Sequence, residues 1–285
     1  MSVVNTNISA SVAQAALARN DRALGTAMEQ LSTGRKINSA ADNASGLAIS
    51  TRMTSQIRGL DQAVRNANDA ISMVNTAEGA LDEISNMLQR MRELAVQSGT
   101  GTTSSNDRVS IDAEYDHLVA EIERVSANTE FNGRALLTGA AGGAATVSGV
   151  TYQVGMDPTQ TIAVNFGNMA SDATMASLNG FGLDATTIAS AIAKSSRVIV
   201  AADLAIEAVS TQRATFGAVS NRLEHSVDNL TNVMTQAEAS RSRILDTDYA
   251  ASTSELARTQ IIQQAGTAML AQANQLPATV LALLR

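Results

Sequence analysis

The chain has 285 residues and a formal net charge of −7, and its 20 basic residues are scattered rather than clustered. A nucleic-acid surface requires clustered Lys and Arg, so that class of partner is excluded. Cysteine is absent, which excludes disulfides and thiol chemistry, and aromatic residues make up only 2% of the chain. The apolar residues are mainly Ala, Leu, Ile, Val and Met, which suit thin seams between helices rather than a thick globular core.

Neither end of the sequence has the features of a membrane-directed segment. The first 20 residues have no basic stretch and no compact apolar stretch, so a cleaved secretory signal peptide is not predicted. Residues 259–284 carry no charge, but they contain several amides that are poorly suited to hydrocarbon. Membrane insertion is therefore not expected.

The first predicted helix covers residues 3–33. Its apolar face includes Ile8, Val12, Leu24 and Leu31. Gly34 ends it, because glycine is common just after the last turn of a helix. Residues 35–44 follow as a polar connector with turn and capping side chains.

A long helix is predicted from about residue 45 to residue 98. Its apolar residues alternate three- and four-residue steps from Leu60 through Leu81 to Ala95, which is the repeat of a coiled coil. Such a helix is roughly 80 Å long at about 1.5 Å per residue. A compact globule of this chain length is only about 50 Å across, so an elongated protein is predicted.

The centre of the chain has a different character. A loop at 99–105 precedes a third helix that is expected to start near Asn106 or Asp107, and a turn follows at 131–133. Short variable loops are predicted at 139–149 and 167–190. Between them, two runs of alternating apolar residues predict a β-hairpin near 150–166.

A second long heptad pattern runs from Val209 to Ile244, and a final helix follows Asp248. The predicted fold is therefore mainly α, an elongated antiparallel helical bundle or coiled coil with a small β-hairpin region in the centre of the chain. The terminal helices have narrow apolar faces and few charges, so they are expected to become ordered against neighbouring subunits. The residues assigned to this assembly contact are Ile8, Val12, Leu24, Leu31, Ile262, Met269, Leu276 and Val280.

No arrangement of reactive side chains predicts catalysis. His117 and His225, the only histidines, lie in helical patterns without converging ligands, so a metal site is not predicted. Asp246 and Asp248 resemble part of a calcium loop, but the Gly and the terminal Glu of that loop are missing, which favours a capping or contact role. The carboxylates within 112–116 are two residues apart and do not face one another on a helix. No catalytic, cofactor-binding or metal-binding residue is assigned, and an enzyme is not expected.

Several blocks of the sequence resemble flagellin, the subunit of the bacterial flagellar filament. They are LSTGRKINSAADNASGLAIS at 31–50, LQRMRELAVQSGTGT at 88–102 with FNG at 131–133, and SRILDTDYA at 242–250 continuing through IIQQAGTAMLAQANQLP at 261–277. The hairpin sequence YQVGMDPTQTIAV at 152–164 also matches. The chain departs from the family pattern at 251–254, and its short centre implies a form without large outer domains.

The resemblance implies a structural subunit that polymerises into the flagellar filament for swimming motility, without a cofactor. It implies an inner tube domain made of residues 1–44 and 242–285, and a rod domain of residues 45–241 that carries the hairpin. It also implies type III export without a cleaved signal peptide and an extracellular location on the flagellum. The implied partners are other copies of the chain, an export chaperone, the filament cap and hook-associated proteins.

The resemblance implies a second contact segment around residues 88–97. In the family this segment packs against the next subunit, and in many flagellins a host Toll-like innate immune receptor reads it. The residues assigned to subunit contact and receptor recognition are Gln89, Arg90, Arg92, Glu93, Leu94, Gln97 and Glu114.

The sequence also allows one alternative function. Under this alternative, the chain is a hook-associated junction protein or a coiled-coil surface adhesin related to flagellin. The blocks at 33–50 and 263–277 favour flagellin itself.

Overall fold

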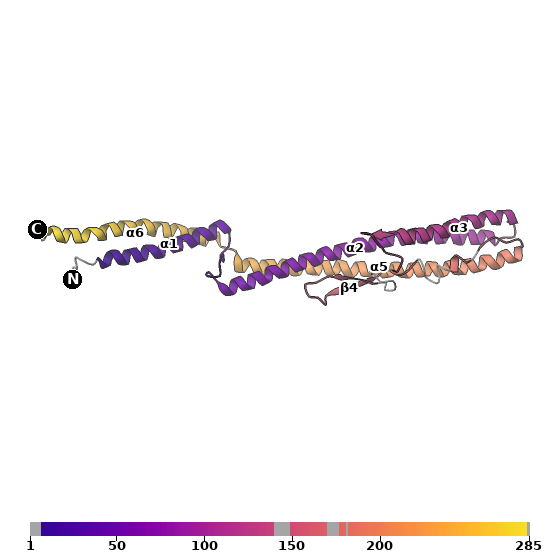
Figure 1. Cartoon of the computed structure of the whole chain (residues 1–285), viewed down its shortest axis with the longest axis horizontal. Coiled ribbons are helices and arrows are strands. Elements are labelled where there is room, and N and C mark those ends of the chain that lie inside the picture. The colour runs from indigo at the N-terminus through magenta and orange to yellow at the C-terminus, as the bar shows by residue number, and fades with distance from the viewer. Residues whose placement is uncertain (1–6, 140–148, 170–176, 181, 284–285) are drawn as a thin grey trace. The chain divides into compact units, whose positions relative to one another are not determined.

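The computed structural model describes residues 7–139, 149–169, 177–180 and 182–283, and it describes the side chains of the last helix as far as Gln275. The order of elements confirms a mainly α fold with a small β-hairpin region (Figure 1). The helices are α1 (Ile8–Thr33), α2 (Ala44–Ser98), α3 (Ser105–Asn128), α5 (Ile188–Leu245) and α6 (Tyr249–Leu283). The strands are β1 (Glu130–Phe131), β2 (Arg134–Ala135), β3 (Gly149–Gln153) and β4 (Thr161–Asn165).

Packing divides the chain into two units. The terminal unit consists of Met1–Ile57 and Thr235–Arg285, and the central unit consists of Arg58–Met234. Because α2 and α5 are long, each contributes residues to both units. The assignment of 1–44 and 242–285 to an inner tube, and of 45–241 to a rod, stays a prediction.

In the central unit, α2 and α5 run in opposite directions with their heptad faces together (Figure 1). Arg92 of α2 pairs with Asp203 of α5 at 2.7 Å, whereas the earlier Asp82 pairs with the later Arg213 at 2.9 Å. Between these pairs, the buried residues that face the partner helix are apolar and are spaced three or four apart, so each helix buries a continuous stripe. The buried cluster includes Val74, Leu81, Leu88 and Met91 of α2 and Val198, Val209, Phe216 and Leu223 of α5.

α3 folds back along α2 and starts at a capping box. The Ser104 hydroxyl accepts a hydrogen bond from the Asp107 backbone N–H at 3.2 Å, and the Asp107 carboxylate accepts one from the Ser104 backbone N–H at 3.0 Å. The Ser104 hydroxyl also donates to the Asp107 carboxylate at 2.7 Å, and this bond, together with the one from the Ser104 backbone N–H, lowers the pKa of Asp107. The prediction of Asn106 or Asp107 as the N-cap is therefore wrong by two or three residues. The capping box pairs two backbone N–H groups, those of Ser104 and Asp107, whereas a single capping side chain at Asn106 or Asp107 would pair one, and this favours Ser104 as the N-cap.

The buried side chain of Arg108, in the first turn of α3, binds backbone carbonyl groups at the C-terminus of α2. The side chain of Arg108 is only 2% exposed. Its Nε donates to the carbonyl oxygen of Ser98 at 3.2 Å, and its Nη2 donates to that of Thr100 at 3.3 Å. Positive charge is favourable at a helix C-terminus, where carbonyl groups lack helical partners. Arg108 thus joins the last turn of α2 to the first turn of α3.

The hairpin of β3 and β4 packs onto the long helices, as the alternating pattern predicts. The strands are antiparallel, with Val150 opposite Val164 and Tyr152 opposite Ile162. Side-chain amides tie both strands to helices: the Asn66 amide donates to the Gln153 carbonyl at 3.1 Å, and the Gln212 amide donates to the Asn165 carbonyl at 2.7 Å. These bonds hold the hairpin so that its apolar face packs against the buried cluster of the long helices. The buried residues of this face are Val150, Ile162, Val164 and Phe166.

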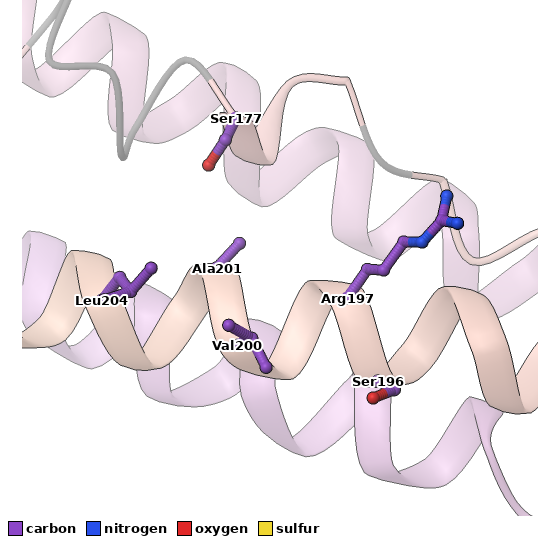
Figure 2. Close-up of a pocket in the computed structure, with 6 residues that line it drawn as sticks. All are labelled: Ser177, Ser196, Arg197, Val200, Ala201 and Leu204. Carbon is purple, nitrogen blue, oxygen red and sulfur yellow. The ribbon is translucent and has the colours of Figure 1, made fainter.

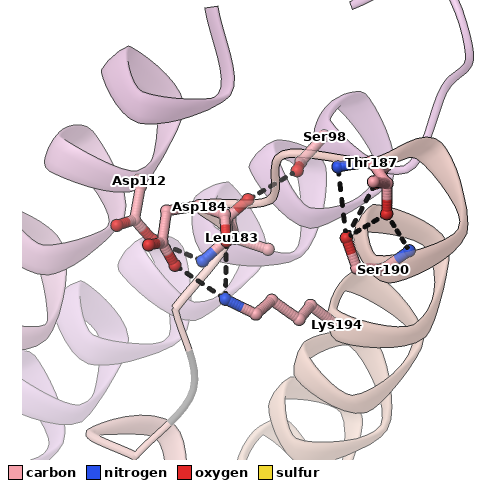
Figure 3. Close-up of polar contacts among 7 residues, drawn as sticks. All are labelled: Ser98, Asp112, Leu183, Asp184, Thr187, Ser190 and Lys194. Atoms are coloured by element: carbon pink, nitrogen blue, oxygen red, sulfur yellow. Dashed lines mark hydrogen bonds and ion pairs between the residues drawn. The ribbon is translucent and has the colours of Figure 1, made fainter. Parts of the chain in front are cut away.

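The segment before α5 is held against α2 and α3 by polar bonds (Figure 3). The Asp112 carboxylate accepts a bond from the Leu183 backbone N–H, and the Ser98 hydroxyl donates to the Leu183 carbonyl at 3.3 Å. Lys194 of α5 pairs with Asp184 at 2.8 Å. Thr187 and Ser190 then cap the start of α5 (Figure 3). The predicted loop at 167–190 therefore gives way to helix at its last three residues, and 170–176 and 181 lie outside the described residues.

Burial of two tyrosines makes the central unit sensitive to alkaline pH. Burial raises the pKa of Tyr115 above its usual range and that of Tyr152 to about 12, because a phenolate in the core loses solvation. In the unfolded chain both phenols ionise near pH 10, so the free energy of unfolding should be unaffected below about pH 9 and should fall as the pH rises through about 10 to 12. Urea unfolding followed by circular dichroism at pH values of about 8 and 11 checks this. The fall should be smaller when Tyr115→Phe and Tyr152→Phe are combined, and an undiminished fall in that variant would contradict it.

In the terminal unit, α1 and α6 pair antiparallel (Figure 1). Asn7 at the start of α1 donates from its amide to the Ala273 carbonyl at 2.8 Å, and Asn20 donates to the Thr259 carbonyl at 2.8 Å. Beyond α1, Gly34 adopts a left-handed φ of 68°, as a C-cap glycine does. The connector then pairs with the end of α5, where the Lys36 backbone N–H donates to the Leu245 carbonyl at 2.7 Å.

Candidate functional site

Four of the carboxylates considered for chemistry have structural partners. Glu114 pairs with Arg90 at 2.7 Å, and Asp112 holds Leu183. Asp246 accepts a bond from the Ser242 hydroxyl at 2.7 Å, and Asp248 accepts bonds from backbone N–H groups in the first turn of α6. Within the described residues, no group of three or more His, Cys, Asp or Glu side chains is placed to hold a metal ion. Among the residues that the structure describes, no helix is both long and apolar enough to span a membrane.

A groove of about 380 Å³ lies on α5 in the central unit (Figure 2). Its lining consists of Ser177, Ser196, Arg197, Val200, Ala201 and Leu204. Val200 and Leu204 are large apolar side chains that remain exposed. Figure 2 shows the Arg197 side chain extending from α5 toward the segment that precedes the helix. This lining contains no carboxylate and no imidazole, so the groove is an apolar surface without an acid–base pair.

The terminal unit has an unusual distribution of side chains. Where α1 meets α6, the buried residues are small or polar, among them Asn20, Ala27, Ser252 and Thr259. Leu17, Leu24, Leu256 and Leu270 also face this seam, but they are only partly buried. Other large apolar side chains, among them Ile8, Val12 and Met269, lie outside the seam and are exposed. Because an amphipathic helix usually turns its larger apolar residues toward its partner helix, these exposed residues mark a second apolar surface on the outer faces of α1 and α6.

The structure separates the predicted assembly residues into two groups. Ile8 and Val12 are 63% and 64% exposed, Met269 is 65% exposed, and Ile262 is also exposed. Leu24 and Leu31 are half-buried in α1. Leu276 and Val280 belong to α6, but their side chains lie outside the described part of the chain. The six residues whose side chains the structure describes therefore do not form one continuous face.

Two exposed apolar residues of the terminal unit, Met28 of α1 and Ile261 of α6, are not among the residues assigned to assembly. Met28 lies on the apolar face predicted for residues 3–33, at helical spacing from Leu24 and Leu31, whereas Ile261 lies outside the face that carries Ile262 and Met269. A helix whose apolar residues fall on more than one face is a signal of contact with more than one neighbour.

The second predicted contact segment forms an exposed charge cluster on α2 and α3. Arg90 bonds to Glu114 and, at 3.1 Å, to Glu93, and the Glu114 carboxylate raises the pKa of the Arg90 guanidinium. Arg92 extends instead to Asp203 of α5. Exposed ion pairs of this kind add little stability. Their side chains are thus available for contact with a partner.

Leu94 differs from the rest of this segment. Its side chain is 1% exposed and belongs to the buried cluster of the central unit. In this structure it supports the exposed charges from beneath rather than offering a contact surface. Gln89 and Gln97 are exposed on α2.

The chain matches known proteins over its whole length. Family models of the bacterial flagellin N-terminal and C-terminal helical regions match residues 4–141 and 199–284. A flagellin of Halalkalibacterium halodurans is 44% identical over 284 residues, covering 99% of this chain and 100% of that protein, and a flagellin of Bacillus subtilis is 43% identical over 302 residues, covering 99% of each. The crystal structure of Bacillus cereus flagellin aligns with a TM-score of 0.50 and 34% identity, covering 58% of this chain and 88% of that one. With its antiparallel helices and central hairpin, this chain belongs to the flagellin family.

Proposed function

We propose that this protein is the structural subunit of a bacterial flagellar filament and assembles through the outer apolar faces of α1 and α6. The observation that carries this assignment of the surface is the exposure of Ile8, Val12 and Met269, with small and polar residues in the seam between the helices. Complete burial of one such side chain contributes about 1.5–3 kcal/mol. Repeated in every subunit, this gain favours a polymer. Contacts that do not close on themselves generate an open helix.

In this proposal, residues 1–44 and 242–285 form the inner tube and residues 45–241 form the surrounding rod. The separation of the chain into a terminal and a central packing unit supports it. The central unit has its own large buried cluster and does not depend on α6 for its core. It is therefore suited to a rod that keeps its fold while the terminal helices form contacts.

The proposed partners follow from this assignment. The subunit leaves the cell through the flagellar type III pathway without a cleaved signal peptide, and it is held beforehand by an export chaperone. At the filament ends it meets the cap and the hook-associated proteins. The alternative of a hook-associated junction protein or an adhesin is not favoured, because the full-length matches are to flagellins.

The charge cluster on α2 and α3 is proposed as a subunit contact and as the segment that a host Toll-like innate immune receptor reads. Gln89, Arg90, Glu93 and Glu114 are exposed on adjacent helices, with Gln97 further along α2, and Arg90 joins the two helices. Their exposure and the geometry of the Arg90 pairs support this role.

Electron microscopy of filaments sheared from the native cells, with mass spectrometry of the protein they contain, tests the filament function. The 29.6 kDa chain should be a major filament component. A trace amount confined to a filament junction would instead indicate a junction protein.

Charge placed on the outer face of α6 should stop assembly without unfolding the chain. In the double variant Ile262→Glu and Met269→Glu, two carboxylates would have to be desolvated between subunits, which costs several kcal/mol. Filament yield by sedimentation should drop at least about tenfold, because about 1.4 kcal/mol already changes an equilibrium tenfold. The control is Ile262→Val with Met269→Leu, which keeps both sites apolar and should assemble. Normal filaments from the Glu variant would exclude this face as a contact.

A further inference from the structure

The least exposed residues of α1 and α6 define one antiparallel seam with three- and four-residue spacing, as in a coiled coil. They include Ala10, Ala13, Leu17, Asn20, Leu24 and Ala27 of α1, and Leu256, Thr259, Gln263, Gly266, Leu270 and Ala273 of α6. Several of the side chains in the middle of this seam contribute little apolar area. Apolar packing alone therefore gives only a small energy difference between this alignment of the helices and a neighbouring one, so other interactions must select the alignment.

Asn20 lies at the centre of the seam and is 8% exposed. Its side-chain amide donates to the Thr259 carbonyl at 2.8 Å and to Gln263 Oε1 at 3.1 Å. The Thr259 hydroxyl is satisfied within its own helix, by the Glu255 carbonyl at 2.9 Å. A slip of seven residues in one direction would bring Asn20 opposite Gly266 and Leu270, which offer no side-chain acceptor. The buried amide then loses the Gln263 bond, and leaving a buried polar group unsatisfied is costly.

One turn away, Leu17 fits against Gly266. A Cβ atom added to Gly266 would lie 2.7 Å from Leu17 Cδ2 and 3.1 Å from Leu17 Cγ. The absence of a side chain at Gly266 is therefore what admits Leu17. A slip of seven residues would place Leu17 opposite Thr259 or Ala273, where a side chain fills this space. Glycine inside a helix is less favourable than alanine, so its presence here is explained by the close approach of Leu17.

We propose that Asn20 and Gly266 together determine the register of the α1–α6 pair. They act as specificity determinants against the slip toward Leu270, because the observed alignment satisfies both and each costs helix or seam stability compared with Leu or Ala. The register in turn sets the positions of the outer residues of α1 relative to those of α6. A slip of seven residues would displace the two sets by about 10 Å along the seam. The consequence for filament contacts rests on the proposed function, whereas the register itself does not.

The chain has no cysteine, so engineered pairs report the register without background. Asn7→Cys with Ala273→Cys reports the observed alignment, in which Asn7 bonds to the Ala273 carbonyl. Gln14→Cys with Ala273→Cys reports a slip of seven residues, since Gln14 occupies the equivalent place one heptad later. The full-length chain is oxidised with copper phenanthroline, and the fraction with an intramolecular disulfide is measured by non-reducing electrophoresis. The observed-register pair should form at least about tenfold faster than the slipped pair, which equals about 1.4 kcal/mol of preference.

Asn20→Leu and Gly266→Ala should each reduce this ratio, and together they should bring it to within about threefold of unity. Asn20→Leu should at the same time raise the melting temperature of the terminal helices, because an apolar residue replaces a buried amide. Asp21→Leu adds the same apolar side chain at an exposed position beside the seam and should leave the ratio unchanged. If Asn20→Leu lowers the melting temperature and leaves the ratio of the two disulfide formation rates unchanged, Asn20 stabilises the helix pair without selecting its register. That result would overturn the proposal. Failure of the parent chain to form filaments would contradict the proposed function and leave the register result standing.

Discussion

Removal of residues 256–285 should abolish filament formation and leave the central unit folded. The deletion removes most of α6, including the Thr259 and Gln263 groups that bind Asn20. α1 then has no partner, and an isolated helix of its length is marginal in water. The buried cluster of the central unit contains no residue from the deleted segment, so its packing persists. The truncated chain should therefore sediment as a monomer under conditions where the full-length chain forms filaments.

Two measurements separate loss of assembly from loss of fold. Circular dichroism should show an unchanged thermal transition for the central unit, with helix loss limited to the terminal helices. The full-length chain carried through the same purification is the control, and it should polymerise. Filaments of normal length from the truncated chain would place assembly in the central unit instead. A lost central transition would contradict the independence of the two units.

Substitution of Arg108 by Met should destabilise the central unit by about 2–3 kcal/mol, because the buried Ser98 carbonyl and the partly buried Thr100 carbonyl lose their donor. Met has a similar length and retains the packing of the aliphatic stem, so the loss reports the guanidinium. The affected groups are the Ser98 and Thr100 carbonyls at the end of α2. Loss of positive charge at a helix C-terminus adds to the effect. Few single substitutions in this chain are expected to cost as much without creating a cavity.

Urea unfolding at neutral pH, followed by circular dichroism, measures this loss. Arg108→Lys keeps the charge and fewer of the donors, so its loss should lie between those of the parent and the Met variant. Val109→Met changes the exposed neighbour and should stay within about 0.5 kcal/mol of the parent. Equal stability of the Met variant and the parent would show that water replaces the guanidinium at these carbonyls.

The long helices were the most predictable part of this molecule. The repeat through Leu60, Leu81 and Leu88 extends over many turns, and each step predicts the same buried face, so local exceptions do not obscure it. The hairpin was predictable for a similar reason, because both of its strands alternate and a turn sequence with Asp157 separates them.

The seam of the terminal unit was not predictable in the same way. Its pattern contains Asn20, Thr259, Gln263 and Gly266, which a search for apolar spacing passes over. Ile8 and Val12 were therefore grouped with Leu24, although the structure leaves the first two on the outside. Arg108 was also missed, since an arginine that binds backbone carbonyls has no local sequence motif and its burial depends on the fold of α3 against α2.

The weak apolar content of the α1–α6 seam has a kinetic consequence. In this seam, four partly exposed leucines alternate with amides and small side chains, so the helix pair has only modest free energy with which to stay closed in a single chain. Two free chains that meet must therefore order four helices at once before any large apolar face is covered. A chain that arrives at an existing polymer end orders only its own two. The barrier to nucleation is consequently higher than the barrier to elongation, so dilute subunits should remain soluble and lengthen filaments that already exist.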